Sequence, residues 1–245
     1  MLDRVSIEKI NDPRYIKVYI ALSGGVDSVV MLDLVHKICD KPIFAIHVNH
    51  NLSEESGEAQ SFCVKLAGAY SIKCFVAEVN IKAKGSIEAA ARKSRYEAFE
   101  KFLGPNDLIL LAHHAGDQIE TALFKLFRGG GGFGLNGMPR ERAIGMATLY
   151  RPMLTLSKPQ ILNYARENRL RWIEDSTNLE DMFDRNYIRR NIVPAIVNRF
   201  AYAENAILDK LERDGQLRSK IELQAKKELS ALRTDRDSIE LANLK

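Results

Sequence analysis

Cysteine is scarce in this 245-residue sequence, which has three cysteines and no CxxC pair. Neither a disulfide framework nor a cysteine-rich zinc site is therefore predicted, and a reducing compartment is favoured. No apolar run approaches the roughly 20 residues that a membrane-spanning helix needs. The opening residues, MLDRVSIEKINDPRY, are too polar for a signal peptide. The sequence is thus expected to be that of a cytoplasmic protein with no membrane partner.

A strong overall charge is also missing, since the formal net charge is only +4. The charges are unevenly distributed, however. Residues 128–200 contain 12 Lys and Arg against 7 Asp and Glu, whereas the remaining chain has 24 basic and 25 acidic residues. A surface for a polyanion is therefore expected in the second half. From charge alone, a solvated and salt-bridged surface is an equally good interpretation.

Short β-branched runs alternate with helical patterns from residue 16 to residue 127. This alternation predicts an α/β fold with a parallel sheet, right-handed crossovers and helices on both faces. Strands are expected at 16–22, 43–48, 72–79, 108–112 and 144–150, and helices at 26–38, 54–69, 86–102, 117–127 and 158–168. In parallel sheets, ligands bind beyond the carboxyl ends of the strands. The reactive residues are therefore expected directly after each strand.

The chain divides into two expected parts. Residues 1–200 are predicted to form the main α/β domain, and residues 201–245 a helical linker or appendage. The helix at 158–168 has Ser157 as a candidate N-cap and Pro159 in its first turn. After Phe200 the sequence is charged and favours helix as far as Leu232. That segment is expected to be one helix or a helical hairpin.

The turn after the first expected strand has the composition of a phosphate-binding loop. It reads Ser23, Gly24, Gly25, Val26, Asp27 and Ser28. Glycines permit a tight turn, and the amide groups at the start of the following helix form a cradle for phosphate. Asp27 would repel a bare phosphate, which predicts a bridging Mg²⁺ ion. The Gly-Lys-Ser/Thr sequence of a Walker A motif is missing, so transfer of the γ-phosphate is disfavoured.

This SGGVDS sequence resembles the PP-loop of the ATP pyrophosphatases. Members of that superfamily cleave ATP between its α and β phosphates and adenylate an oxygen of carbonyl type. The resemblance implies a Rossmann-like domain of the adenine nucleotide α-hydrolase kind, with ATP as co-substrate together with Mg²⁺. The superfamily includes small-molecule amidating ligases, tRNA thiolases and lysidine-forming enzymes, so later segments must distinguish among them.

Those segments resemble the tRNA(Ile)-lysidine synthetases, in the order of that family. Residues 47–50 (HVNH) match the start of an HxNHxLR segment, although Ser53 stands where Arg is common. Residues 91–96 (ARKSRY) match ARxxRY, which places Arg92 and Tyr96 on one helix face. Residues 113–121 (HHAGDQIET) match HHxxDQxET.

The remaining matches follow a glycine-rich stretch. Residues 128–138 (RGGGGFGLNGM) formally contain GxGxxG, but they follow a helix rather than a strand, which weakens a dinucleotide interpretation. The stretch instead ends like the GLxGM loop of the family. Residues 151–154 (RPML), 174–178 (EDSTN) and 183–190 (FDRNYIRR) complete the resemblance.

The resemblance implies a two-step ligation. ATP adenylates the C2 oxygen of the wobble cytidine of a CAU-anticodon tRNA(Ile), and free L-lysine then displaces AMP to give lysidine. It also implies site residues. Catalytic roles are expected for Asp27, Asp117, Arg185 and Arg189, with Mg²⁺ on Asp27. Nucleotide contacts are expected from Ser23, Gly24, Gly25, Val26, Asp27, Ser28, His47, Asn49, His50, Arg92, His113 and His114.

Several alternatives stay open at this stage. A thiolase would need reactive cysteines, and Cys39, Cys63 and Cys74 are not in paired motifs. The pair His113 and His114 could hold zinc, but adjacent residues on an extended segment point in opposite directions. The chain is short for the family, whose larger C-terminal tRNA-binding domains are expected to be absent. A non-catalytic nucleotide-binding or tRNA-binding fragment, or a homodimer, is therefore also compatible with the sequence.

Overall fold

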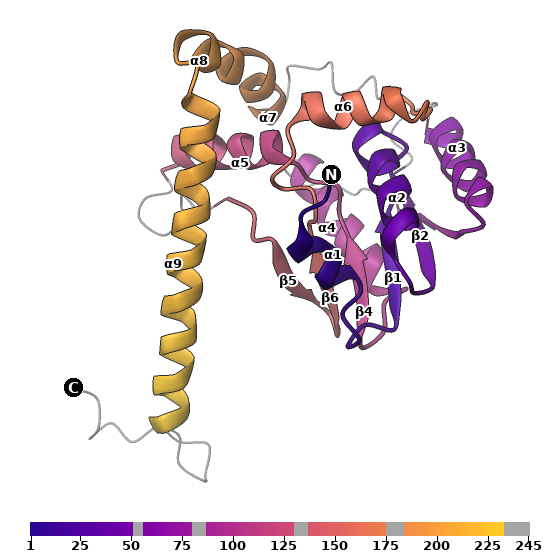
Figure 1. The fold of residues 1–245 in the computed structure, drawn as a ribbon, viewed down its shortest axis with the longest axis horizontal. Helices are drawn as coiled ribbons and strands as arrows, with labels where there is room; N and C mark the ends of the chain where they lie inside the picture. Colours follow the sequence, from indigo (N-terminus) through magenta and orange to yellow (C-terminus); the bar gives the residue numbers. More distant parts are fainter. Residues whose placement is uncertain (51–55, 80–86, 130–136, 175–183, 233–245) are drawn as a thin grey trace.

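The computed structural model describes residues 1–50, 56–79, 87–129, 137–174 and 184–232. Its centre is a six-stranded sheet in the order β3-β2-β1-β4-β6-β5 (Figure 1). The strands are β1 Lys17–Ala21, β2 Ile43–Asn49, β3 Lys73–Glu78, β4 Asp107–Leu110, β5 Glu141–Ile144 and β6 Ala147–Tyr150. All neighbouring strands pair in parallel except β5, which is antiparallel to β6. The predicted parallel α/β sheet is confirmed.

Helices pack on both faces of this sheet. In chain order, the helices of the described residues are α1 Arg4–Ile10, α2 Val26–Ile38, α3 Ser56–Ala69, α4 Ile87–Glu100, α5 Ala115–Phe127, α6 Lys158–Glu167, α7 Asp184–Tyr187, a π-helical segment Ile188–Ile192, α8 Val193–Arg199 and α9 Ala203–Leu232. The last four of these pack mainly on α5 and on one another rather than on the sheet. Strand β1 shows why both faces are apolar. Val18 and Ile20 pack with α2, α3 and α6, whereas Tyr19 packs with Phe99 of α4 on the other face.

One predicted strand was wrong in part, and one helix was not predicted. Of the expected strand at 144–150, residues 147–150 form β6, but Ile144 ends β5, which pairs with β6 in a hairpin that turns at Gly145 with a φ of +53°. Such a backbone conformation favours glycine, which explains why the apolar run does not continue as one strand. Helix α1 was not predicted, because its seven residues are too few to show a periodic pattern. The expected N-cap Ser157 is confirmed, and it forms a capping box with Gln160.

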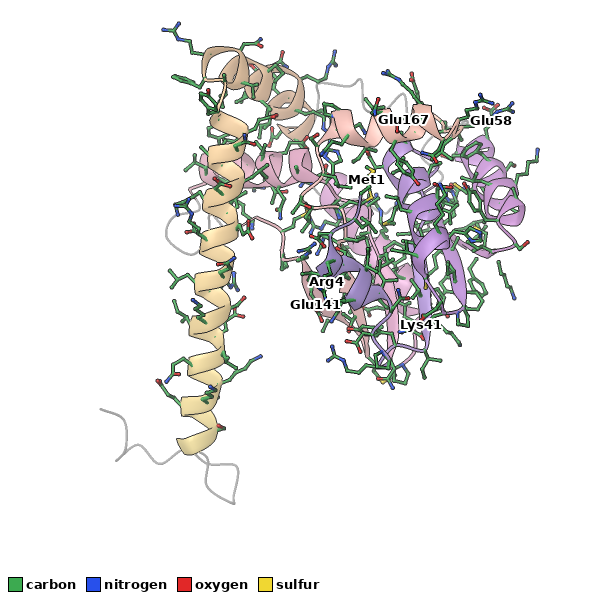
Figure 2. The ribbon with its side chains drawn as sticks, in the orientation of Figure 1. Met1, Arg4, Lys41, Glu58, Glu141 and Glu167 are labelled. Atoms are coloured by element: carbon green, nitrogen blue, oxygen red, sulfur yellow. The ribbon has the colours of Figure 1, made fainter. Side chains whose placement is uncertain are left out.

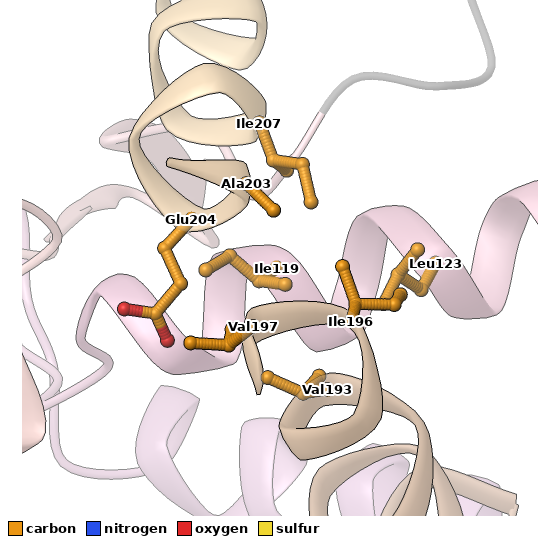
Figure 3. A pocket seen from close by; sticks show the side chains of 8 residues that line it. All are labelled: Ile119, Leu123, Val193, Ile196, Val197, Ala203, Glu204 and Ile207. Carbon is orange, nitrogen blue, oxygen red and sulfur yellow. The ribbon is translucent and has the colours of Figure 1, made fainter. Parts of the chain in front are cut away.

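The C-terminal region is anchored to the rest of the molecule at one end. Apolar side chains from α5, α8 and α9 line a small hollow, among them Ile119, Leu123, Ile196 and Ile207 (Figure 3). Beyond that junction α9 extends away from the sheet, and its side chains project along the free length (Figure 2). Leu217 is accordingly 55% exposed. In the described part of the chain, no helix is long and apolar enough to cross a membrane.

A buried carboxylate connects helix α2 to α3 and α6. Asp33 accepts hydrogen bonds from the hydroxyls of Tyr70 (2.9 Å) and Tyr164 (2.6 Å) and pairs with Lys37 at 2.7 Å. Burial alone would raise the pKa of Asp33, but the hydrogen bonds from Lys37 and both tyrosines bring this pKa below its ordinary value. This network fixes the orientation of α6 against the helix that follows the SGGVDS loop.

Removal of one hydroxyl from this network is expected to lower stability measurably. In Tyr164→Phe, Asp33 and Lys37 each lose a partner, so the free energy of unfolding should fall by about 1 kcal/mol. Urea denaturation checks this value. Tyr202, which is 82% exposed, is the matched control, and Tyr202→Phe should change stability by less than about 0.5 kcal/mol. Equal effects of the two substitutions would contradict the assigned role of Tyr164.

Candidate functional site

The SGGVDS loop lies between β1 and α2, as predicted, and a serine of the loop holds it closed. The hydroxyl of Ser28 accepts hydrogen bonds from the amides of Ser23 and Gly24, each at 3.2 Å, and donates one to the carbonyl of Gly25 at 2.9 Å. Gly25 is the N-cap of α2 and has no side chain to occupy the amides of the first turn. This end of the helix can therefore accept an anion.

Gly24 requires both its conformation and its small size. Its φ is +92°, a region that residues with a side chain rarely adopt. A Cβ atom there would also lie 3.3 Å from the Cys63 sulfur and 3.4 Å from the ring of Phe62. Its carbonyl accepts a hydrogen bond from the amide of Ile173 at 3.0 Å. The loop is thus packed against α3 on one side and the chain after α6 on the other.

Asp27 is paired with a lysine that was not among the site residues predicted from the sequence. The Lys158 ammonium lies 2.6 Å from Oδ1 of Asp27, and the two side chains are 42% and 30% exposed. Lys158 is the first residue of α6, the helix that the Asp33 network holds against α2. A positive charge thus already faces the carboxylate that was predicted to bind magnesium.

The segment 113–121 begins helix α5 and carries its acidic groups on one face. His114 is the N-cap and forms a capping box with Asp117, whose Oδ2 accepts from the His114 amide at 2.9 Å. The next two members of the face are Glu120 and Thr121, which are both buried. The predicted common face of Asp117, Glu120 and Thr121 is confirmed by the arginines that contact it.

Two arginines from the region after residue 183 reach this face. Arg189 binds Glu120 through two nitrogens, at 2.5 and 2.9 Å, and Oδ1 of Asp117 at 3.0 Å. Arg185 donates to the hydroxyl of Thr121 at 2.6 Å. Burial raises the pKa of Glu120 above its usual value despite Arg189. For Asp117, burial is outweighed by the neighbouring histidine side chains, the His114 amide and Arg189, which lower its pKa. Asp27 therefore forms one ion pair with Lys158, whereas Asp117, Arg189 and Arg185 gather on the face of α5.

The Asp27–Lys158 pair and the charged groups on α5 lie near one another. The negative charge of Asp27 is among the causes that raise the pKa of Arg189, although the pairing with Glu120 contributes more. A short segment also joins them, because the Ala115 amide donates to the carbonyl of Leu156 at 2.9 Å, two residues before Lys158. Because β1 and β4 are neighbouring parallel strands, the SGGVDS loop and the 113–121 segment begin at the same edge of the sheet.

His113 lies beside a buried arginine at the end of β4. Nε of Arg151 donates to Nδ1 of His113 at 3.1 Å, and burial lowers the pKa of His113 to about 3. The charges of Arg92 and Arg95 on α4 act in the same direction. The guanidinium of Arg92 lies 5.7 Å from the ring of Tyr96, which confirms the predicted shared face of these two residues. A group of positive charges therefore borders the site on the α4 side.

The three predicted contacts at the end of β2 have different surroundings, and His47 and Asn49 lie within the strand itself. His47 is 5% exposed, and its Nδ1 lies at hydrogen-bond distance, 2.9 Å, from the carbonyl oxygen of Leu22. The side-chain amide of Asn49 donates a hydrogen bond to the side-chain oxygen of Gln60 at 2.8 Å. His50 lies near Arg95, and burial lowers its pKa to about 4. Nucleotide contacts by these residues stay predictions. Ser53, the loop at 130–136 and residues 175–183 lie outside the described residues.

The donor atoms at Asp27 suit a magnesium ion that binds with its nucleotide. Mg²⁺ is usually held by one or two carboxylates together with substrate phosphates and waters. Among the described residues there is no cluster of three or more His, Cys, Asp or Glu that could hold a metal by itself. A single, partly exposed carboxylate beside a phosphate cradle fits the first arrangement. Asp27 would hold the ion, and the ion would neutralise the phosphates.

Comparison with known proteins agrees with this geometry. The sequence model of the PP-loop domain matches residues 3–196. The chain belongs to the PP-loop family. Among solved structures, this PP-loop chain resembles the U34-tRNA thiolase NcsA from Methanococcus maripaludis, which carries a [4Fe-4S] cluster. The TM-score is 0.67, with 16% identity over 86% of this chain and 78% of that one. At this identity the likeness shows the fold alone.

Curated relatives of this PP-loop protein are named tRNA(Ile)-lysidine synthase. That of Pseudomonas fluorescens is 39% identical over 188 residues, which cover 75% of this chain and 42% of the relative. Those of Coxiella burnetii and Methylococcus capsulatus are 38% and 39% identical, over 74% of this chain and 41% and 42% of the relatives. The chain therefore spans less than half the length of the curated relatives it matches.

Proposed function

We propose that this chain carries the ligase site of a tRNA(Ile)-lysidine synthase. ATP adenylates the C2 oxygen of the wobble cytidine of a CAU-anticodon tRNA(Ile), and the ε-amine of free L-lysine then displaces AMP. The observation that carries this proposal is the common site of the SGGVDS loop, the acidic face of α5 and the arginines after residue 183. A cytoplasmic location and the division near residue 200 stay predictions.

The first step requires that a triphosphate is held and aligned. The free amides at the start of α2 would bind the phosphates, and Asp27 would hold Mg²⁺ against the departing pyrophosphate. Lys158 is close enough to Asp27 to exchange its carboxylate partner for a phosphate oxygen when the ion binds. Arg185 and Arg189 would stabilise the negative charge that develops on the activated base and its phosphate.

The second step requires that the ε-amine of the free lysine is deprotonated, so that it can act as a nucleophile. Glu120 is the better proton acceptor of the two α5 carboxylates, since burial raises its pKa and a raised pKa makes a stronger base at neutral pH. Asp117 would orient the ammonium group before the proton is lost. The cytosine must leave its stack to reach these groups, which an anticodon loop permits because its bases are single-stranded.

A thiolase activity is less well supported by the cysteines. Reactive cysteines usually have a lowered thiol pKa and an electropositive, accessible environment. Burial instead raises the pKa of Cys63 to about 12, and it also raises the pKa of Cys39 and Cys74. All three cysteines of the sequence lie in the described part of the chain, and they are free.

ATP–pyrophosphate exchange tests the proposal. The purified chain should exchange labelled pyrophosphate into ATP only in the presence of a transcribed tRNA with a CAU anticodon. A transcript that differs only by U at the wobble position should give no exchange. Labelled lysine should then enter the CAU transcript and appear as lysidine after nucleoside analysis. Exchange without tRNA would indicate a small-molecule ligase, and ATP binding without any exchange would indicate a binding module. Either result would overturn the proposal.

A further inference from the structure

Arg151 is an unusual residue for the interior of a protein. It is only 1% exposed, although arginine is rarely fully buried without a partner of opposite charge. Its guanidinium donates to Nδ1 of His113 (3.1 Å), to the carbonyl of Pro139 (2.7 Å) and to the hydroxyl of Tyr96 (3.5 Å). These three acceptors are uncharged. Within the described ranges, no carboxylate forms an ion pair with it.

The contact with His113 determines the tautomer of that histidine. Arginine can only donate, so Nδ1 of His113 must carry a lone pair. In the neutral imidazole the hydrogen then resides on Nε2. His47 shows the opposite case, because its Nδ1 faces the carbonyl of Leu22, which can only accept and therefore requires a hydrogen on Nδ1. One chain thus contains a histidine of each tautomer, and the bonds to Nδ1 determine both.

The charges around His113 keep it neutral. Arg151 contacts it from the chain after β6, Arg92 and Arg95 face it from α4, and Asp117 faces it from α5. Only Asp117 favours the imidazolium, and Asp117 is itself bound to Arg189. Burial and the three guanidiniums outweigh that single carboxylate. The imidazole therefore stays a donor at Nε2 throughout the neutral range.

We propose that Arg151 is a positioning residue, which fixes His113 as a neutral Nε2–H donor toward an anionic phosphate oxygen of the nucleotide at the SGGVDS loop. This inference rests on the proposed function for the identity of the acceptor. No carboxylate of the described residues pairs with Arg151, so its charge adds a second attraction for the same anion, because burial weakens the screening of a guanidinium by water. Arg151 itself makes no contact with the substrate.

The tautomer is measured by NMR of protein labelled with ¹⁵N-histidine, without any substrate. The His113 signal, assigned by its loss in His113→Gln, should show an unprotonated Nδ1 and a protonated Nε2 from pH 5.5 to 8. His47 in the same spectrum should show the reverse pattern. In Arg151→Met, His113 should become a mixture of tautomers, although burial, Arg92 and Arg95 still keep the imidazole neutral. A protonated Nδ1 in the wild type, or an unchanged His113 signal in Arg151→Met, would overturn the proposal.

Binding of ATP tests the acceptor with a matched pair of variants. A glutamine amide presents an N–H close to the position of Nε2, whereas an asparagine amide presents one close to Nδ1. His113→Gln should therefore retain ATP affinity within about 3-fold, and His113→Asn should lose about 10-fold, the effect of one hydrogen bond to a charged group. Equal losses in the two variants would contradict a donor at Nε2.

The effect of Arg151→Met on ATP binding should be smaller in the His113→Gln background, because the N–H of the glutamine amide does not depend on Arg151. Arg151→Met should weaken ATP binding about 10-fold in the wild type but only about 3-fold in the His113→Gln background. The same loss in both backgrounds would refute positioning through His113. If the wild-type chain did not bind ATP at all, the proposed function would fail, whereas the tautomer result would still decide the role of Arg151.

Discussion

Replacement of Asp27 by asparagine is expected to reduce lysidine formation by about 100-fold or more, the usual effect of the loss of one group that stabilises transition-state charge. The neutral amide has the same shape but cannot hold Mg²⁺ firmly against the pyrophosphate. The fold should persist, because the pair with Lys158 is partly exposed and such pairs contribute at most about 1 kcal/mol. Circular dichroism and urea denaturation check the fold, and lysine incorporation checks the reaction.

Metal dependence distinguishes a lost metal ligand from a lost structural contact. With magnesium removed by EDTA, Asp27→Asn should bind ATP at least as well as the wild type, because a negative charge that repels the phosphates is gone. With magnesium present, the affinity of the wild type for ATP should increase, whereas that of Asp27→Asn should not. Lys158→Gln is the matched control, since it breaks the same ion pair but keeps the carboxylate. If Asp27→Asn retained magnesium-enhanced binding and normal turnover, Asp27 would not be the metal ligand.

The sheet and the loop could be predicted because their signals are local. Each buried parallel strand is an apolar run, and the carboxyl ends of such strands meet at one edge, so the segments after β1, β2 and β4 were expected near one another. The i, i+3 and i+4 spacing of Asp117, Glu120 and Thr121 was sufficient to predict a common face. These inferences need no knowledge of distant contacts.

The residues that the sequence reading missed depend on contacts between distant segments. Lys158 reads as an ordinary first-turn lysine, and only the packing of α6 on α2 brings it to Asp27, 131 positions away. Arg151 was noticed as part of an RPML segment, but no local pattern shows that it is buried against His113. The hairpin at Gly145 was missed for a different reason. The mixed apolar pattern of residues 144–150 is compatible with one strand or with a turn between two strands. The positive φ of Gly145, which produces the turn, cannot be seen in that pattern.

Arg189→Met is expected to destabilise the protein by roughly 2 kcal/mol. Removal of one partner of a fully buried ion pair costs about 3–5 kcal/mol, and we reduce this value because the Arg189 side chain is 41% exposed. Glu120, with its side chain only 6% exposed, would be left in the interior without its ion pair. Urea denaturation measures the loss. Arg199, the exposed last residue of α8, provides the control Arg199→Met, which should change stability much less.

The pH dependence of that loss has a definite sign. Burial already raises the pKa of Glu120 in the folded protein, and removal of Arg189 raises it further. A carboxyl group with a raised folded pKa stabilises the fold fully below its unfolded pKa, and this contribution disappears as the pH rises through the folded value. The difference in stability between wild type and Arg189→Met should therefore shrink as the pH falls from 8 toward 5. A difference that grows on acidification would contradict the pairing of Arg189 with Glu120.

A second substitution separates the structural part of Arg189 from its proposed catalytic part. Glu120→Gln in the Arg189→Met background removes the unpaired charge, so the double variant should recover more than half of the lost stability. If Arg189 only holds α5 in place, part of the ATP–pyrophosphate exchange should return with the fold. If it also stabilises the adenylated base, exchange should stay at least about 100-fold below the wild type in a stable protein. We expect the second outcome, because Arg189 bonds the acidic face of α5 and also interacts with the charge of Asp27, near which the proposed first step would develop negative charge.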